Sequence, residues 1–250
     1  ELLAIKAEVE ASEIAPFEDN TVIEPLLNPS IKLKGSKVKA TATNESLGYT
    51  EWTLKNGIKV VVRPSTLKAD EVIISATAKG GKSMLNDADY FHGDYLAMVM
   101  QQSGISKFSA TELAKQLSGK SAYASVGVGA YEHAVNAGGS PKDIETILQL
   151  MYLNFTAPRF SEDDFATLMN RYNSMLANQL TNPDFIFRQK NQQTTYNNNY
   201  RRQQLTPELL NKVKLEQMEA IHKRFYSNAA DFRFTFVGNM SAEQLKPLVE

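Results

Sequence analysis

The pattern of apolar and polar residues divides the chain into a polar first part and a regularly patterned remainder. Residues 1–47 begin with a short helical pattern at 1–12, and Pro16, Pro25 and Pro29 then interrupt any longer period. Residues 1–30 hold seven acids and one lysine, whereas residues 31–40 hold four lysines. This composition is typical of a surface connector, so we predict a short helix followed by extended chain over 1–47.

From residue 48 onward the pattern predicts strands first and mostly helices later. Residues 49–64 form two strand-like runs joined at Asn56-Gly57, a dipeptide that favours a type I′ hairpin turn. Residues 71–81 form a further β-branched strand that ends in a glycine pair, and alternation of side chains predicts strands at 120–130 and 231–239. Another strand is expected at 131–139. Helical spacing predicts helices at 86–104, 109–119, 140–158, 161–183, from 184 into a polar stretch, at 206–226 and from 241 onward.

This order of elements indicates the fold class. Strands joined by hairpins beside grouped helices favour an α+β fold, in which helices pack on one face of a largely antiparallel β-sheet. An apolar share of 42% in 250 residues can supply the core of such a subdomain, which we expect to span residues 48–250. The chain starts at Glu1 without Met and stops at Glu250 within a helical pattern, so we expect it to be part of a longer protein.

Composition and charge exclude several classes of function. The absence of cysteine rules out disulfide frameworks, thiol nucleophiles and thiolate metal sites. A net charge of −1 gives no general attraction to nucleic acid or to an anionic membrane, so we expect neither as a partner. No apolar run reaches the eighteen or so residues that a spanning helix needs.

The histidines do not form a metal motif in the sequence. His92, His133 and His222 are far apart, and none has a second histidine four residues away. Glu219 and His222 match the Glu-x-x-His spacing of di-iron bundles, but no second copy occurs on another helix. We therefore interpret the three as surface or boundary histidines. The sequence also lacks the nucleophile elbow and the phosphate-binding loops.

One polar segment, residues 189–204, has two interpretations. It could present a surface that binds peptide or single-stranded nucleic acid, with contacts from Tyr196, Tyr200, Arg201 and Arg202. It could equally be a solvated helix end followed by a loop. The balanced charge and the single arginine pair favour the second interpretation over nucleic-acid binding, and the four residues stay as candidates for facing a peptide.

Three long stretches resemble one known family. Residues 54–85, 108–165 and 224–250 resemble the corresponding parts of a repeat in the pitrilysin/insulysin-type zinc metallopeptidases. The resemblance covers about 49–250 and is greatest to bacterial single-chain members built from two halves. The stretch IEPLLNPS at 23–30 resembles the connector that follows the first half of such enzymes.

The resemblance also shows what this chain lacks. In the catalytic subdomain of the family, an H-x-x-E-H motif places two zinc ligands and a general base on one face of a helix. Tyr95, Met98 and Val99 stand at the His, Glu and His positions of this motif. A distal glutamate would fall before Pro183, yet residues 165–183 contain no acid. We therefore expect no zinc, other cofactor or catalytic residue here. We expect the motif face of this helix to pack in the core instead.

By resemblance, the chain is the first subdomain of the C-terminal half of a zinc metallopeptidase that degrades peptides. It would be inactive alone and would form part of the wall of the substrate chamber, while zinc would bind only in the N-terminal half of the parent. Its partners would be the other subdomains of its parent, an unfolded peptide and, in a homo-oligomer, a second copy. Relatives of this type favour the periplasm or cell envelope. The alternative is a structural or assembly module of the same fold without a peptidase partner half.

Overall fold

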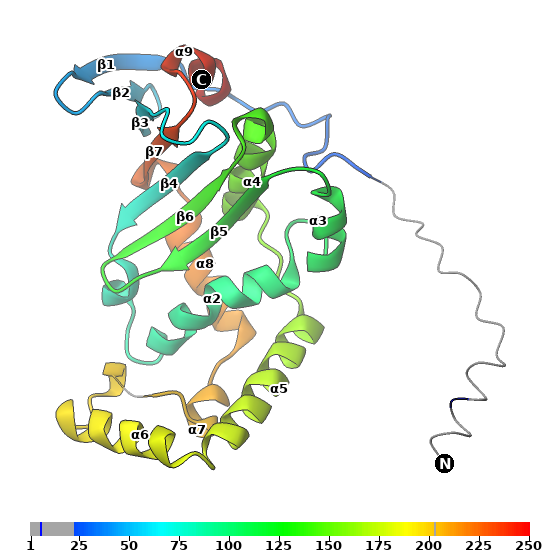
Figure 1. The fold of residues 1–250 in the computed structure, drawn as a ribbon, viewed down its shortest axis with the longest axis vertical. Helices are drawn as coiled ribbons and strands as arrows, with labels where there is room; N and C mark the ends of the chain where they lie inside the picture. The colour runs from blue at the N-terminus through cyan, green and yellow to red at the C-terminus, as the bar shows by residue number, and fades with distance from the viewer. Residues whose placement is uncertain (1–5, 7–22, 203) are drawn as a thin grey trace.

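A single twisted sheet forms the centre of the computed structural model, which describes residue 6, residues 23–202 and residues 204–250 (Figure 1). Apart from Lys6, the short helix expected at 1–12 lies outside the described residues. The described strands are β1 (Val38–Asn44), β2 (Tyr49–Leu54), β3 (Lys59–Pro64), β4 (Val72–Lys79), β5 (Ala122–Val128), β6 (Glu132–Gly139) and β7 (Arg233–Gly238). They lie in the order β1-β2-β3-β7-β4-β6-β5. Five of the six neighbouring pairs are antiparallel and only β3 and β7 run parallel, so the sheet is largely antiparallel as predicted.

The helices of the described chain follow the predicted order. They are α2 (Tyr90–Ser103), α3 (Ala110–Gln116), α4 (Ile144–Thr156), α5 (Glu162–Gln179), α6 (Pro183–Thr195), α7 (Pro207–Leu210), α8 (Leu215–Tyr226) and α9 (Ala242–Val249). Short 3₁₀ turns are η1 (Gly81–Met84), η2 (Pro141–Asp143), η3 (Tyr200–Arg202) and η4 (Ala229–Asp231). Side-chain capping fixes several starts: α3 and α9 both begin with a capping box, from Ser109 with Glu112 and from Ser241 with Gln244.

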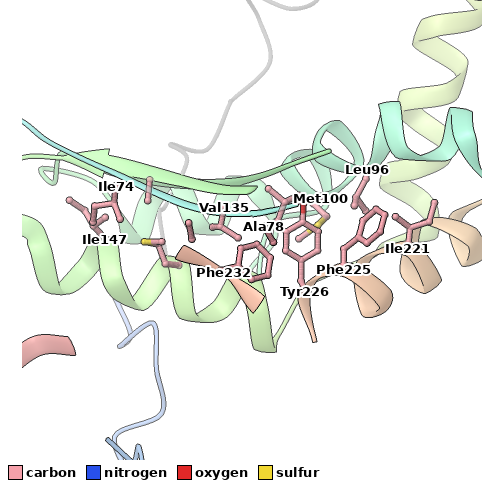
Figure 2. Close-up of a cluster of buried hydrophobic side chains, with 14 of the residues drawn as sticks. Ile74, Ala78, Leu96, Met100, Val135, Ile147, Ile221, Phe225, Tyr226 and Phe232 are labelled. Carbon is pink, nitrogen blue, oxygen red and sulfur yellow. The ribbon is translucent and has the colours of Figure 1, made fainter. Parts of the chain in front are cut away.

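Burial along β4 shows that the helices cover one face of the sheet. Val72, Ile74, Ala76 and Ala78 are buried on one face, whereas Ile73 on the other face is 49% exposed. Figure 2 shows the core side chains in a layer between the sheet and helices α4 and α8. The contributions from the helices include those of Leu96 and Met100 on α2, Ile147 on α4, and Ile221, Phe225 and Tyr226 on α8. This is the α+β arrangement that the sequence predicts.

The sheet begins earlier than the expected boundary at residue 47. Val38–Asn44 form edge strand β1, which pairs with β2 in antiparallel register, Thr41 lying opposite Trp52. Most of β1 is exposed on both faces, so its sequence carries no apolar alternation. Before β1, the chain is held to the domain by Leu26, which is buried in a small cluster with Ile105, Phe108, Leu150 and Leu153.

The start of the sheet also touches the far end of the chain. The Val38 backbone N–H donates to Glu250 Oε1 at 2.9 Å, and Lys37 Nζ lies 3.4 Å from Glu250 Oε2. Edge strand β1 and the residue that follows α9 therefore meet at one corner of the fold (Figure 1).

The helix expected at 206–226 is two helices in the structure. Thr206 caps α7, which ends after one turn at Leu210, and α8 starts at Leu215. Leu210, which ends α7, and Val213, in the turn that follows it, are both buried, so this turn is packed against the core. Helices α5, α6 and α7 lie beyond α2, away from the sheet (Figure 1). None of the helices in the described part of the chain is long and apolar enough to cross a membrane.

Candidate functional site

Helix α2 carries the three residues that the resemblance places at the positions of the zinc motif. Tyr95 and Val99, four residues apart, share the helix face that packs into the core and are 6% and 0% exposed. Met98 is half-buried beside them. The helix enters the core because its apolar residues recur at helical spacing, and Gly104 ends it.

A tyrosine from α5 closes this face of α2. The Tyr172 hydroxyl donates to Met98 Sδ at 2.7 Å, and its ring meets the Tyr95 ring edge to face, with centroids 5.8 Å apart at 87°. Helix α5 is the segment in which the resemblance would place the distal zinc ligand. An aromatic side chain therefore fills the space between the two helices that would otherwise hold the ligands.

The chemistry of these side chains does not fit a zinc ion. Burial raises the pKa of Tyr95 above its usual value of about 10, with smaller contributions from Tyr172 and Asp94, so its phenol stays protonated. Met98 offers only a thioether that already accepts a hydrogen bond, and Val99 offers no donor atom. Within the described residues, no group of three or more His, Asp or Glu side chains could hold a metal ion.

The interpretation of the histidines as surface or boundary residues is wrong, because all three are buried, at 4–6% exposure. His133 Nδ1 accepts from the Gly81 N–H at 3.3 Å, and its ring stacks on Phe225 with centroids 4.5 Å apart. His222 Nε2 lies 2.8 Å from the Asn154 carbonyl oxygen. Burial lowers the pKa of each histidine, so each is a neutral part of the core.

The four candidate residues at 189–204 form two separate pairs. Tyr200 packs edge to face on Phe91, and Arg201 pairs with Asp87 at 2.8 Å, so both lie against the start of α2. Tyr196 is 46% exposed, and the Arg202 guanidinium lies over its ring at 5.5 Å. The structure thus brings Tyr200 and Arg201 to α2 and leaves the other two on the surface; whether any of them faces a peptide stays a prediction.

A groove lies beside edge strand β5, and none of the site residues predicted from the sequence lines it. It has a volume of about 440 Å³ and lies between β5, helices α2 and α3, and the inner side of α4. Ala97 on α2 and Ala122 and Ala124 on β5 line it, so small side chains create the space. The alternation of small residues in AYASVGV was visible in the sequence, but the facing helices were not.

Backbone groups along β5 point into solvent beside this groove. The bonds Gly129 N–H to Glu132 O and Ser140 N–H to Ser121 O, each 2.8 Å, flank the β5–β6 pair. Antiparallel bonding alternates along a strand, so odd-numbered residues of β5 bond β6 and even-numbered residues point away from it. Among the described strands, β5 has no neighbour on that outer side. An extended segment could therefore pair with the backbone of Ala122, Ala124 and Val126.

Comparison with known proteins identifies the class to which this fold corresponds. No protein-family model matches the chain. The fold is that of M16 peptidase domains: the peptidase M16 inactive domain from Pseudomonas fluorescens superposes with a TM-score of 0.61 and 17% identity, over 81% of this chain and 49% of that one. The α+β fold predicted from the sequence is thus confirmed.

Two individual proteins match nearly the whole chain. The periplasmic protease PqqL from Escherichia coli superposes with a TM-score of 0.75 and 20% identity, over 99% of this chain and 27% of PqqL. The zinc protease PQQL-like of Arabidopsis thaliana is 21% identical over 241 residues, which are 96% of this chain and 22% of that protein. These similarities confirm the resemblance to pitrilysin-type peptidases. The chain spans about a quarter of the length of these two proteins.

Proposed function

We propose that this chain is a non-catalytic subdomain of a larger zinc peptidase and forms part of the wall around its peptide substrate. The observation that carries the proposal is the closure of the zinc-motif face of α2 by Tyr172, in a fold shared with M16 peptidases. A subdomain whose metal position is occupied by packed side chains can still contact the substrate of the enzyme through its surface. Zinc would then bind only in the other half of the parent.

Coverage by the relatives supports the division into connector and subdomain. PqqL matches 99% of the chain, whereas the inactive domain from Pseudomonas fluorescens matches 81%. That smaller share corresponds to about 203 of the 250 residues, the length of 48–250. We infer that most of residues 1–47 link this subdomain to a preceding half, with β1 added to the sheet from the end of the linker. Like PqqL, the parent would act in the periplasm or cell envelope.

The β5 groove is the part of the wall best suited to an extended peptide. Backbone pairing with an edge strand recognises any sequence, because every peptide carries the same N–H and C=O groups. The apolar floor from α2, α3 and α4 would hold side chains of alternate residues. This combination suits an enzyme that handles unfolded peptides of varied sequence.

The test is an Ala124→Pro variant of the full-length parent. Because the Ala124 N–H points away from β6, proline removes a donor to the peptide without removing a ladder bond. Loss of one such bond should lower kcat/KM for a fluorogenic peptide about two- to tenfold. Zinc content and the thermal midpoint should stay at wild-type values, and Ala124→Ser, which keeps the N–H, is the matched control.

The alternative, a structural module without a peptidase half, predicts different results. In that case the full-length parent would show no peptide turnover and would hold no zinc. If instead Ala124→Pro turns over peptide like the wild type, the β5 edge does not bind substrate. If the 250-residue chain alone holds one zinc and cleaves peptide, the subdomain is catalytic and the proposal is wrong.

A further inference from the structure

Another cavity lies at the start of α2, whereas the β5 groove is lined by residues toward the end of this helix. It has a volume of about 440 Å³ and is lined from three places in the sequence. The loop and first turn of α2 supply Asp87, Ala88, Phe91 and His92, η3 supplies Tyr200, and the turn after α7 supplies Lys212 beside Leu209 and Val213. Cavities of this size with mostly apolar walls and a few polar groups are typical of ligand sites.

Two buried polar side chains in this cavity have no hydrogen-bond partner among the described residues. His92 is only 6% exposed, yet neither of its ring nitrogens makes a hydrogen bond. The backbone carbonyls of Ala88 and Lys212 lie near enough to raise its pKa in part, without hydrogen-bonding geometry. The Tyr200 hydroxyl is likewise buried and unpaired. Buried polar groups are nearly always hydrogen-bonded, so a ligand that enters this cavity can form hydrogen bonds with both groups.

Contacts in the cavity wall hold the Tyr200 side chain in position. The Tyr200 ring packs on Phe91 with centroids 5.2 Å apart and on Tyr90 at 6.2 Å. Arg201, the next residue, is fixed by Asp87 and lies over the Tyr90 ring at 4.8 Å. The Tyr200 side chain is therefore oriented by its neighbours and does not depend on a hydrogen bond of its own.

The charges around His92 indicate an uncharged ligand. Burial lowers the pKa of His92, so its imidazole is neutral and presents one N–H donor and one nitrogen acceptor. The wall carries charges of both signs: Lys212 lines the cavity, Asp87 lines it while paired with Arg201, and Asp89 is the charged group with the largest effect on His92. The wall therefore gives no net preference to an anion or to a cation. A neutral amide, which offers both a C=O acceptor and an N–H donor, matches the imidazole and the phenol.

We propose that the cavity between α2, η3 and α7 binds a short uncharged stretch of peptide, whose backbone amides bond to His92 and Tyr200. The proposal rests on the proposed function, because it assigns a second contact for the same class of substrate. In this proposal the Tyr200 hydroxyl contacts the peptide, and Arg201 helps to position the Tyr200 side chain. Apolar side chains of the peptide would lie against Leu209 and Val213.

Nuclear magnetic resonance of the histidine rings tests this directly, because the 250-residue chain has only three histidines. The probe is N-acetyl-trialanine amide, titrated into the ¹⁵N-labelled chain, with His92→Gln used to assign the His92 resonances. We expect a saturable shift of the His92 ring nitrogens and no shift at His133 or His222. Trialanine with a free carboxylate should bind more weakly.

Tyr200→Phe provides the decisive variant, since it removes the hydroxyl and keeps the ring that packs on Phe91. It should raise the dissociation constant of the probe about two- to tenfold, as expected for one lost hydrogen bond. Tyr131→Phe, at a tyrosine that is 80% exposed between β5 and β6 and lines neither cavity, is the control and should change nothing.

An unshifted His92, equal shifts at all three histidines, or an unchanged affinity in Tyr200→Phe would overturn the proposal. These outcomes are independent of the β5 groove. A loss of turnover in Ala124→Pro together with an unshifted His92 would keep the chamber-wall function and reject this cavity as a peptide site.

Discussion

Restoring the zinc motif on α2 should damage the fold instead of creating a metal site. The variant is Tyr95→His, Met98→Glu and Val99→His in one chain. Val99 is fully buried and Tyr95 nearly so, and the facing helix α5 offers Tyr172 in place of an acid. Two imidazoles and a carboxylate would therefore enter an apolar contact without a third protein ligand opposite them.

The cost can be worked out from these contacts. Removing the Val99 side chain from the core loses about 1.5–3 kcal/mol, and losing the edge-to-face contact of Tyr95 with Tyr172 about 0.5–1.5 kcal/mol. Each buried imidazole without a partner costs about 1–3 kcal/mol. The total of about 4–10 kcal/mol is comparable to the whole free energy of unfolding of a typical domain.

Thermal unfolding followed by circular dichroism, with and without excess zinc, measures the effect. Even a loss of about 4 kcal/mol should reduce the thermal midpoint by about 8–16 °C, and zinc should not restore the midpoint. Gln101→His, on an exposed position of the same helix, is the control and should stay within about 0.5 kcal/mol of the wild type. A triple variant that keeps the wild-type midpoint and retains one zinc per chain after dialysis would show that this face of α2 is an open metal site.

Three further predictions concern the fold. The three histidines have pKa values lowered by burial, so the unfolded chain binds more protons; the free energy of unfolding should fall as pH drops below about 6.5, and a midpoint that rises on acidification would contradict this. Gly81→Ala should destabilise by about 1 kcal/mol or more beyond Gly119→Ala, because both glycines have a positive φ (56° and 77°) but only at Gly81 would a Cβ collide with the backbone of Gly129 and Glu132; equal losses of thermal midpoint would refute the steric argument. Arg201→Ala should speed chymotryptic cleavage near Tyr200, since it frees η3 from Asp87, and Arg202→Ala should not.

The elements with strong local signals could be predicted from the sequence. The turn at Asn56-Gly57 between β2 and β3 and the capping box at Ser109 depend on neighbouring residues alone, and both lie where they were expected. The predicted type I′ geometry is wrong, because Gly57 has a positive φ of 92° and Asn56 does not. The β-branched residues at 71–81 likewise predicted strand β4, whose alternating burial the structure adds. The local sequence therefore sufficed to predict the elements that are determined by interactions between neighbouring residues.

Features that depend on contacts distant in sequence could not be predicted. Strand β1 has one large apolar residue, Val38, and only pairing with β2 makes it a strand. The burial of His133 depends on Phe225, which is 92 residues away and stacks on its ring. The positions Tyr95, Met98 and Val99 followed from the resemblance, but their closure by Tyr172 follows only from the packing of α2 against α5.

The contact between Val38 and Glu250 has a mechanical consequence. The residues before β1 are held elsewhere, where Leu26 is buried in its own small cluster, so this contact joins only the two ends of residues 38–250. One hydrogen bond and one ion pair close that stretch into a loop whose two ends lie at the same corner. A force that pulls these two ends apart therefore acts on this contact before it acts on the strand pairs of the sheet.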